Sequence, residues 1–207
     1  ANAEPVTRAY SLANKPADGG GAVLNIRLAV PPPGAGPDVP PGLVSSWLFS
    51  LRQGDRVALS GPFGDFGASN TGREMVLIGG GVGMAPLRAI VHDQLQRAGS
   101  TRKISFWYGA RSASDAFYID EFRALEKAHP NFRFVLALSD PGPGDTGEAR
   151  TGFIHQVAHE AYLRDHPAPE DCEYYLCGPP LMIDAVNAML DSLGVDSEAI
   201  YYDDFGG

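Results

Sequence analysis

From residue 73 onward, short apolar runs alternate with longer amphipathic stretches. The apolar runs have the length of buried strands: Met75–Ile78, Ile104–Tyr108, Phe132–Leu138, Glu173–Leu176 and Ile200–Tyr202. The amphipathic stretches have helical spacing: Ala85–Arg97, Asp120–Ala128, Phe153–Arg164 and Leu181–Leu193. Strands that alternate with helices form a parallel sheet, and right-handed crossovers place helices on both faces. We therefore predict a doubly wound parallel α/β domain over residues 73–207.

The first 72 residues have a different character. Two short extended segments, Val23–Val30 and Asp55–Ser60, are bounded by glycine and proline, so we expect two strands there. The segment between them, Pro31–Gly42, starts with three consecutive prolines and ends in Pro-Pro-Gly. A docking motif for proline-binding domains is one interpretation. A surface loop is the better one, because Gly and Asp interrupt any continuous polyproline helix.

Composition limits the classes of function. The hydrophobic content of 44% suits a buried core. A formal net charge of −9 argues against non-specific nucleic-acid binding, which requires an excess of Lys and Arg. No apolar run approaches the roughly 20 residues of a membrane helix, and Ala1–Thr7 lacks the basic start and apolar stretch of a signal peptide. We expect any membrane anchor to lie outside this chain.

The cysteines and histidines indicate no metal or disulfide framework. Cys172 and Cys177 are too few for a disulfide scaffold or an iron–sulfur cluster. Two nearby free thiols are typical of a reducing compartment, so we expect a cytosolic chain. His155 and His159 lie one helical turn apart, a spacing that can bind zinc. The pattern lacks a metalloprotease Glu and a third ligand, so an ordinary helix face is the better interpretation, and we predict no metal site.

The run Gly79–Pro86, of sequence GGGVGMAP, lies directly between a predicted strand and a predicted helix. Glycines let the backbone turn sharply and let a pyrophosphate approach its N–H groups. The helix N-terminus behind them adds a partial positive charge. A glycine pattern alone is weak, but the strand before it and the helix after it are the context that a dinucleotide-binding turn requires. A purely structural glycine turn is the alternative.

A second turn, Cys177-Gly178-Pro179-Pro180, follows the fourth predicted strand and precedes a helix. In an open parallel sheet, ligands bind at the carboxyl ends of the strands, so both turns can line one crevice. Cys177 is either a small buried hydrophobe or a residue beside the ligand. Its place at the end of a strand favours the second interpretation.

Four motifs occur in the order found in the ferredoxin–NADP⁺ reductase superfamily: Arg8-Ala9-Tyr10-Ser11, Gly42-Leu43-Val44-Ser45-Ser46, the Gly79–Pro86 turn and Cys177-Gly178-Pro179-Pro180. The chain resembles this superfamily over essentially its whole length. The resemblance implies part of an antiparallel β-barrel FAD-binding domain over residues 1–72. It also implies that the α/β domain over residues 73–207 binds NADH.

Within the superfamily, the chain is most similar to the F subunits of the bacterial Na⁺-translocating NADH:quinone oxidoreductases. This closer likeness rests on six stretches: Arg8–Asn14, Pro40–Ser46, Trp107–Arg111, Gly152–His155, Pro169–Tyr175 and Asp203–Gly207. It implies a module that accepts hydride from NADH onto FAD and passes electrons to a 2Fe–2S centre in a domain outside this chain. It also implies partner subunits in a sodium-translocating, ubiquinone-reducing complex, with this chain at the cytoplasmic face of the bacterial inner membrane.

The likeness implies roles for the matched positions. Arg8 would pair with the FAD pyrophosphate, Tyr10 would lie against the isoalloxazine ring, and Ser11 would hydrogen-bond near N5, which accepts the hydride. Phe205 would cover the other flavin face and Cys177 would sit beside the nicotinamide, so Ser11 and Cys177 are the candidate catalytic residues. Further donors to the FAD phosphates would be Gly42, Ser45 and Ser46. The residues around the NADH pyrophosphate would be Gly80, Gly81, Gly83, Met84, Pro86, Gly178 and Pro179.

Three further expectations concern the extent and the specificity of the chain. Only seven residues precede Arg8, whereas the family's flavin barrel has strands before that position, so we expect an N-terminally truncated chain. The loops after the second and third predicted strands offer both Arg111 and Asp140, and the resemblance favours NADH over NADPH. Two other functions use the same motifs: the reductase component of a soluble oxygenase, and a non-catalytic nucleotide-binding or assembly module.

Overall fold

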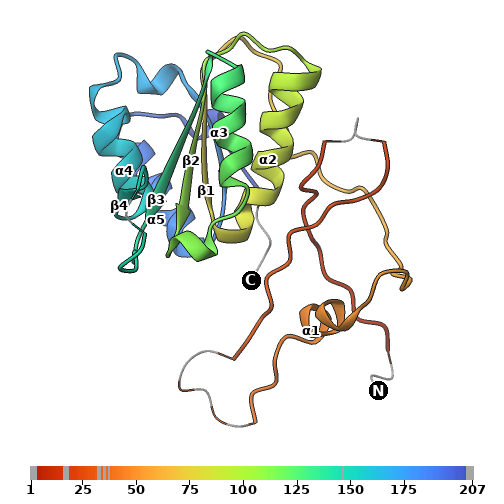
Figure 1. Ribbon diagram of the computed structural model, residues 1–207. Coiled ribbons are helices and arrows are strands. Elements are labelled where there is room, and N and C mark those ends of the chain that lie inside the picture. Colours follow the sequence, from red (N-terminus) through yellow and green to blue (C-terminus); the bar gives the residue numbers. More distant parts are fainter. Residues whose placement is uncertain are drawn as a thin grey trace.

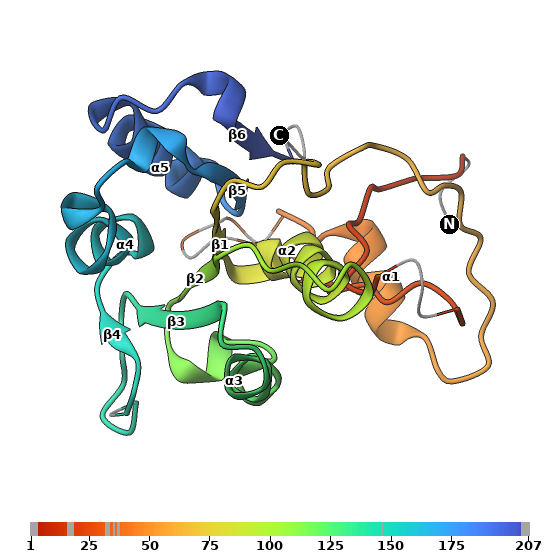
Figure 2. The ribbon, with the colours of Figure 1, turned by 90° about the horizontal axis from the view of Figure 1, so that it is seen from above.

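The computed structural model describes residues 4–15, 19–31, 34, 36, 38–145 and 147–203 of the 207-residue chain. Its six parallel strands form a sheet in the order β4-β3-β2-β1-β5-β6, of which Figure 1 labels β4 to β1 and Figure 2 labels all six. The strands are β1 Met75–Gly80, β2 Ile104–Ala110, β3 Phe132–Leu138, β4 Arg150–Thr151, β5 Glu173–Cys177 and β6 Ile200–Tyr202. The helices are α1 Leu43–Ser50, α2 Met84–His92, α3 Ile119–Ala128, α4 Ile154–Ala161 and α5 Pro180–Ser192. The predicted doubly wound α/β fold is confirmed.

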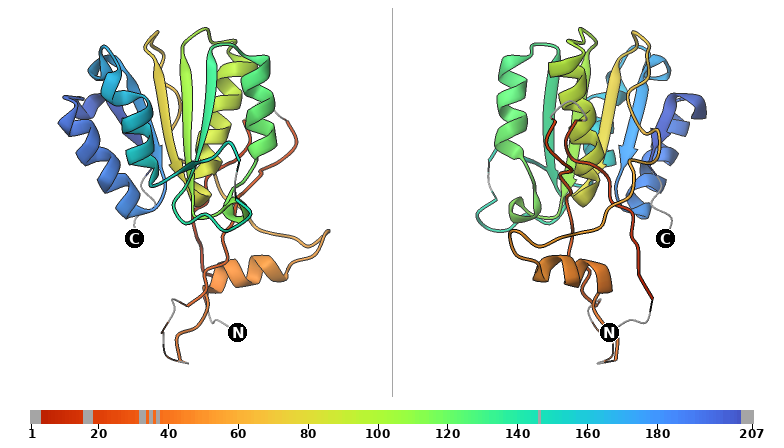
Figure 3. Two further views of the ribbon diagram at one scale, coloured as in Figure 1. Left: turned by 60° about the vertical axis from the view of Figure 1, so that its left-hand side comes forward. Right: turned by 90° about the vertical axis from the view of Figure 1, so that its right-hand side faces the viewer.

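Helices cover both faces of the sheet, as Figure 3 shows. Helices α2 and α3 cover one face, where Leu87 and Phe106 belong to one buried apolar cluster. Helices α4 and α5 cover the other face, where Val186 and Trp107 belong to a second cluster. Phe106 and Trp107 face opposite clusters because side chains alternate along a strand. A strand buried on both sides reads as a continuous apolar run, which is why the sequence located these strands well.

Strand β1 lies where the direction of chain winding reverses. The chain passes from β1 through α2 to β2 on one side, and β5 pairs with β1 on the other side. Gly79 of β1 is in register with both Tyr108 of β2 and Cys177 of β5, so the three strands end almost level. Open α/β sheets bind ligands outside the carboxyl ends of their strands at such a point. The topology therefore brings both glycine-rich turns to one edge.

One expected helix ends where predicted but changes its helix type, and another ends earlier than predicted. The expected helix Ala85–Arg97 is α2 followed by a turn of π-helix, Asp93–Arg97. The expected helix Phe153–Arg164 is α4, which ends before Tyr162 because this residue leaves the helical region, with φ −149° and ψ −61°. The Tyr162 ring stacks on Trp107 at 5.8 Å between centroids. None of the helices in the described part of the chain has the length and apolar character needed to traverse a bilayer.

The expected strands Val23–Val30 and Asp55–Ser60 are wrong. Among the described residues before β1, pairing of extended backbone is limited to one antiparallel bridge, between Leu12 and Leu24. An extended sequence preference forms a strand only where a neighbouring backbone offers partners along its length. Some backbone amides in these segments bond to side chains rather than to a neighbouring strand. For example, the Ala29 N–H donates to the Ser45 hydroxyl of α1 at 3.1 Å.

Hydrogen bonds tie the first part of the chain to α2 and α3. The Arg88 guanidinium of α2 donates to the Ala13 carbonyl at 2.5 Å and also forms a two-point contact with Glu121 of α3. The Tyr118 hydroxyl, just before α3, donates to Asn25 at 2.8 Å. Figure 2 shows α1 on the same side of the sheet as α2. The N-terminal residues are thus held beside the sheet face that α4 and α5 do not cover.

A buried ion pair closes the amino-terminal edge of the sheet. Arg102, before β2, pairs with Glu173 at the start of β5, and their side chains are 8% and 1% exposed. The Glu173 carboxylate also accepts hydrogen bonds from the Ser69 and Thr71 hydroxyls at 2.5 and 2.9 Å. Burial raises the pKa of Glu173, but its hydrogen-bond donors outweigh burial and hold the pKa below its ordinary value of 4.5. The segment leading into β1 is therefore bound to β5 through this carboxylate.

We predict that Arg102→Ala lowers the free energy of unfolding by about 3–5 kcal/mol, because it leaves the Glu173 carboxylate buried without its counter-ion. Denaturant unfolding followed by circular dichroism measures the loss. Arg97→Ala is the matched control, since it removes the exposed partner of Asp93 in a helical ion pair, and we expect little change from it. Equal destabilisation by the two variants would contradict this role for Arg102.

Candidate functional site

Two glycine-rich turns leave the sheet side by side, after β1 and after β5. In the first turn, Gly81 has a left-handed backbone with φ +55°, and Gly81–Gly83 forms a 3₁₀ turn that leads into α2. A Cβ on Gly81 would meet no atom within 4 Å, so a ligand can approach the backbone there. The N-terminus of α2 adds a partial positive charge. Backbone N–H groups on an open turn before a helix suit a pyrophosphate.

The two turns are in direct contact, and the contact requires glycine. A Cβ on Gly83 would lie 2.1 Å from the carbonyl oxygen of Cys177 and 2.8 Å from the nitrogen of Gly178. A Cβ on Gly178 would lie 3.1 Å from the nitrogen of Gly80 and 2.6 Å from a methyl carbon of Met182. Both turns therefore form one surface at the carboxyl edge of the sheet. Of the predicted pyrophosphate residues, Met84 and Pro86 are buried beneath this surface and Pro179 is exposed on it.

The segment that contains Ser11 reaches the same edge. The Ser11 hydroxyl donates to Asp203, which follows β6, at 3.0 Å. Burial raises the pKa of the Cys177 thiol to about 12, and the nearby Asp203 charge contributes to the rise. The Cys177 side chain is fully buried, so its thiol stays protonated at neutral pH. It can pack against a ligand, but it is not an activated nucleophile.

The remaining predicted flavin residues occupy different situations. Arg8 is exposed, and its guanidinium donates to the carbonyl of the adjacent Thr7 at 2.8 Å. Tyr10 is partly exposed. Phe205 lies outside the described residues. The roles of Arg8, Tyr10 and Ser11 against FAD stay predictions; the structure shows Ser11 hydrogen-bonded to Asp203, which follows β6 at the carboxyl edge.

The predicted phosphate donors Gly42, Ser45 and Ser46 lie at the N-terminus of α1. The Gly42 N–H donates to the Ala29 carbonyl at 2.8 Å, and the Ser46 N–H donates to the Gly42 carbonyl at 2.9 Å. The Ser45 hydroxyl donates to the same carbonyl at 3.1 Å. The Gly42 N–H thus ties α1 to residue 29, and the Ser45 hydroxyl also accepts the Ala29 N–H at 3.1 Å. The other N–H groups in the first turn of α1, which have no intrahelical acceptor, are therefore the backbone donors that suit a phosphate.

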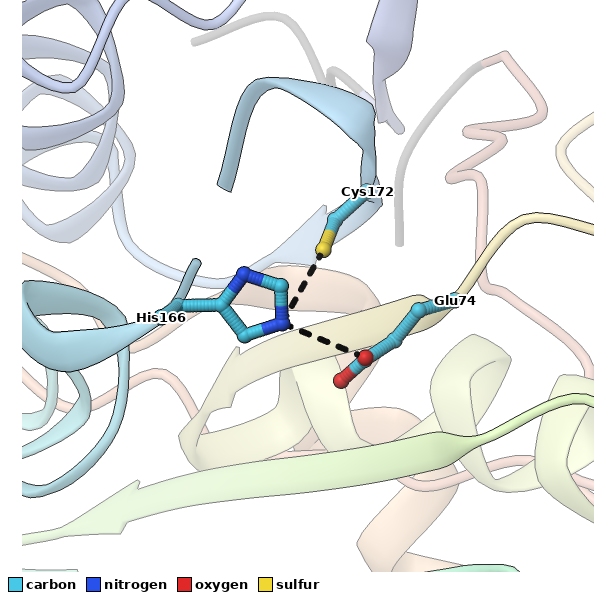
Figure 4. Close-up of side chains that lie close together, drawn as sticks. All are labelled: Glu74, His166 and Cys172. Carbon is cyan, nitrogen blue, oxygen red and sulfur yellow. Dashed lines mark hydrogen bonds and ion pairs between the residues drawn. The ribbon is translucent and has the colours of Figure 1, made fainter. Parts of the chain in front are cut away.

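Three potential metal ligands meet at the opposite, amino-terminal edge of the sheet: Glu74, His166 and Cys172 (Figure 4). Their ligand atoms all lie within 4.8 Å of one another. The His166 Nδ1 atom accepts the Ala168 N–H at 3.2 Å, so a neutral ring carries its proton on Nε2, which faces Glu74 at 3.3 Å. The Cys172 thiol donates to the Ala168 carbonyl at 3.8 Å.

This proton arrangement is that of a hydrogen-bonded network. A metal-bound histidine donates from its other ring nitrogen, whereas the other nitrogen of His166 accepts. We therefore assign Glu74, His166 and Cys172 a structural role, as a hydrogen-bonded network at the amino-terminal edge of the sheet. The predicted helix-face pair is separate: in the described residues, neither His155 nor His159 belongs to a group of three potential ligands.

Two protein-family models match the chain. The oxidoreductase NAD-binding domain matches residues 77–188, more than half of the chain and both glycine-rich turns. The chain belongs to this family. The oxidoreductase FAD-binding domain matches residues 1–67, ahead of the oxidoreductase NAD-binding domain. The two predicted cofactors, FAD and NAD, are thereby confirmed at the level of the domain families.

Several proteins are similar to this oxidoreductase NAD-binding domain and the residues before it. The F subunit of the Na⁺-translocating NADH-quinone reductase of Klebsiella pneumoniae is 59% identical over 204 residues, which cover 99% of this chain and 50% of that protein. The chain thus spans about half the length of the curated relatives that it matches. The solved cytochrome P450 reductase GcoB of Amycolatopsis is 34% identical with a TM-score of 0.78, and the match covers 96% of this chain and 56% of that one.

A third similar structure is the cytochrome b5 reductase domain of Ulva prolifera nitrate reductase. It is 25% identical with a TM-score of 0.79, and the match covers 98% of this chain and 81% of that one. The predicted resemblance to the ferredoxin–NADP⁺ reductase superfamily, and within it to the F subunits, is confirmed.

Sequence analysis missed two residues of the site. The Tyr108 hydroxyl donates to the Gly81 carbonyl at 3.1 Å, although the run Phe106–Tyr108 indicated only a core strand. The sequence did offer one indication: a tyrosine is the last buried residue of the strand, level with the start of the glycine-rich turn. Asp203, the acceptor of Ser11, was named only as part of the family's C-terminal stretch.

We predict that Gly83→Ala destabilises the domain by about 1–3 kcal/mol or more, because the new methyl group must displace the Cys177 backbone. Chemical denaturation measures the change. Gly144→Ala is the matched control: a Cβ at Gly144 meets no atom within 4 Å, and we expect nearly unchanged stability. If Gly83→Ala also left the stability unchanged, the two turns would not be in the contact described here.

Proposed function

We propose that the chain is the NADH-oxidising flavoprotein part of a Na⁺-translocating NADH:quinone reductase. It would accept hydride from NADH onto FAD and pass electrons to a 2Fe–2S centre in a domain outside this chain. The observation that carries the proposal is the contact between the two glycine-rich turns, which joins them into one backbone surface suited to a pyrophosphate, at the edge where Ser11 hydrogen-bonds to Asp203. The name shared by relatives that are 56–59% identical supports the specific assignment.

The NADH half of the proposal uses the backbone of the first turn. The N–H groups of Gly80–Gly83 and the N-terminus of α2 would bind the pyrophosphate. The second turn, at Gly178, would line the path of the nicotinamide toward Ser11. A buried, neutral Cys177 thiol suits a position beside the nicotinamide ring, because it offers an apolar packing surface and adds no charge there.

The FAD half fits the exposed residues of the first part. When bound, FAD supplies the hydride acceptor and releases electrons singly. The exposed Arg8 guanidinium suits a bidentate contact with its pyrophosphate. Ser11, held by Asp203 at 3.0 Å, would hydrogen-bond near N5. The two cysteines, buried at opposite ends of β5, are too few to hold an iron–sulfur cluster, so the next electron acceptor would be a partner.

The partners in this proposal are an iron–sulfur domain and the other subunits of a membrane complex. We place the chain at the cytoplasmic face of the bacterial inner membrane. Support comes from the name of the relatives, which describes a subunit of a sodium-translocating, quinone-reducing enzyme. The free state of Cys172 and Cys177 agrees with a reducing compartment.

Anaerobic rapid mixing tests the proposal. Protein loaded with one equivalent of FAD should lose its flavin absorbance when NADH is added, with about one NADH consumed per flavin. Stable flavin binding without bleaching would instead favour the non-catalytic module. If the protein binds neither FAD nor NADH, the proposal is overturned.

A reductase component of a soluble oxygenase is the second candidate. The 34% identity to a solved cytochrome P450 reductase favours it. Both candidates share the NADH and FAD chemistry and differ in the acceptor of the electrons. Activity with a membrane quinone in the assembled complex supports the first candidate, and activity only with a soluble oxygenase partner supports the second.

We predict a preference for NADH over NADPH. Arg111 and Asp140, after β2 and β3, form an exposed ion pair at 3.2 Å, so the carboxylate offsets the Arg111 charge, which would otherwise attract a 2′-phosphate. We expect kcat/KM for NADH to exceed that for NADPH, and Asp140→Ser to narrow the difference. Asp165→Ser, which disrupts the equally exposed pair with Arg164 at 3.4 Å, should not. Comparable kcat/KM for both coenzymes in the unsubstituted protein would refute the preference.

We predict that Cys177→Ala leaves the fold and the FAD content nearly intact and slows flavin reduction by about tenfold. The smaller side chain would pack less closely beside the nicotinamide and so position it less well for hydride transfer. The measurement is the bleaching rate at saturating NADH. Cys172→Ala, at the other end of β5, removes an equally buried thiol and should keep the rate. If the two variants are reduced at the same rate, Cys177 serves packing alone.

A further inference from the structure

Tyr108 is a fully buried residue at the carboxyl end of β2. Its ring belongs to the apolar cluster under α2 and α3, with its centroid 5.9 Å from that of Phe106. A phenylalanine would fill the same space without burying a hydroxyl. A buried hydroxyl is costly unless it is hydrogen-bonded, so the partner of the Tyr108 hydroxyl indicates what the group does.

That partner is the first glycine-rich turn. The Tyr108 hydroxyl donates to the Gly81 carbonyl at 3.1 Å. Burial raises the pKa of Tyr108 well above its usual range. The hydroxyl is therefore a neutral donor at neutral pH. It links β2 to the turn after β1.

The geometry of a peptide unit gives this bond a consequence on the other side of the turn. In a planar trans peptide, the carbonyl of one residue and the N–H of the next point in opposite directions. The Gly81 carbonyl faces the buried Tyr108 hydroxyl, so the Val82 N–H is directed away from the core. Val82 is 38% exposed, and Gly81 has the left-handed φ of +55° that glycine tolerates. The Met84 N–H also donates to the Gly81 carbonyl, so this carbonyl is held by two donors.

We propose that Tyr108 is a positioning residue for the dinucleotide: its hydroxyl fixes the peptide between Gly81 and Val82 so that the N–H groups of the turn face the pyrophosphate. The inference rests on the proposed function, because it requires that the turn bind NADH. Tyr108 touches neither substrate nor cofactor in this role. It acts through the orientation of the turn, and it would affect affinity for the phosphates and not the rate of hydride transfer at saturation.

The test compares Tyr108→Phe with Tyr175→Phe. Tyr175 is a fully buried tyrosine on the neighbouring strand β5 and belongs to the same cluster. Its hydroxyl donates to Glu173 at 2.9 Å, at the opposite edge of the sheet. Each variant loses one buried hydroxyl and keeps its ring. Calorimetric titration with ADP-ribose reports the pyrophosphate contact, and titration with adenosine reports the remainder of the nucleotide site.

We expect Tyr108→Phe to weaken ADP-ribose binding by about 2–10-fold, with adenosine binding and the saturated rate of flavin reduction unchanged. Tyr175→Phe should leave both affinities unchanged. The ratio of ADP-ribose affinity to adenosine affinity, measured in the same variant, tests the inference even if that variant is partly unfolded. The folded fraction scales both apparent affinities equally. An unaltered ratio in Tyr108→Phe, with normal ADP-ribose binding by the unsubstituted chain, overturns the inference alone. Absence of ADP-ribose binding by the unsubstituted chain overturns the proposed function and the inference with it.

Discussion

The close approach of Gly83 to the Cys177 carbonyl is the contact on which the rest of the site depends. A single methyl group at Gly83 would lie 2.1 Å from that carbonyl oxygen. Without a side chain there, the turn after β1 rests on the turn after β5, and the N-terminus of α2 comes to the surface that the two turns share. Sheet order alone would bring the strand ends together. Because Gly83 has no Cβ, the two neighbouring turns can touch and form one continuous backbone surface.

The NAD-binding region could be predicted from the sequence in considerable detail. The predicted strands Phe132–Leu138 and Ile200–Tyr202 coincide with β3 and β6, because apolar runs between turn residues indicate strands. Strand β4, Arg150–Thr151, was missed for the same reason. Its two residues are exposed, and they extend the sheet edge through backbone pairing with β3 that leaves no apolar pattern.

What could not be predicted depends on contacts between distant residues. Ser11 and Asp203 are 192 positions apart, and the hydrogen bond between them links the first part of the chain to the site edge. The Arg102–Glu173 pair joins residues 71 positions apart, and no periodicity marks either residue. The strands expected at Val23–Val30 and Asp55–Ser60 failed on the same ground, because their sequence carries a local preference and the required partner is not local. Tyr108 was assigned to the core correctly, and its hydroxyl gained a second role only once Gly81 was seen beside it.

The central claim is that the joined turns at the carboxyl edge bind the pyrophosphate of NADH. A titration of ¹⁵N-labelled protein with NAD⁺, followed through the backbone amide shifts, tests it most directly. We expect the largest shifts at Gly80–Gly83 and Gly178, with little change at the amino-terminal edge around Glu74, His166 and Cys172. Largest shifts at that opposite edge, or no shift in the two turns at saturating NAD⁺, would contradict it.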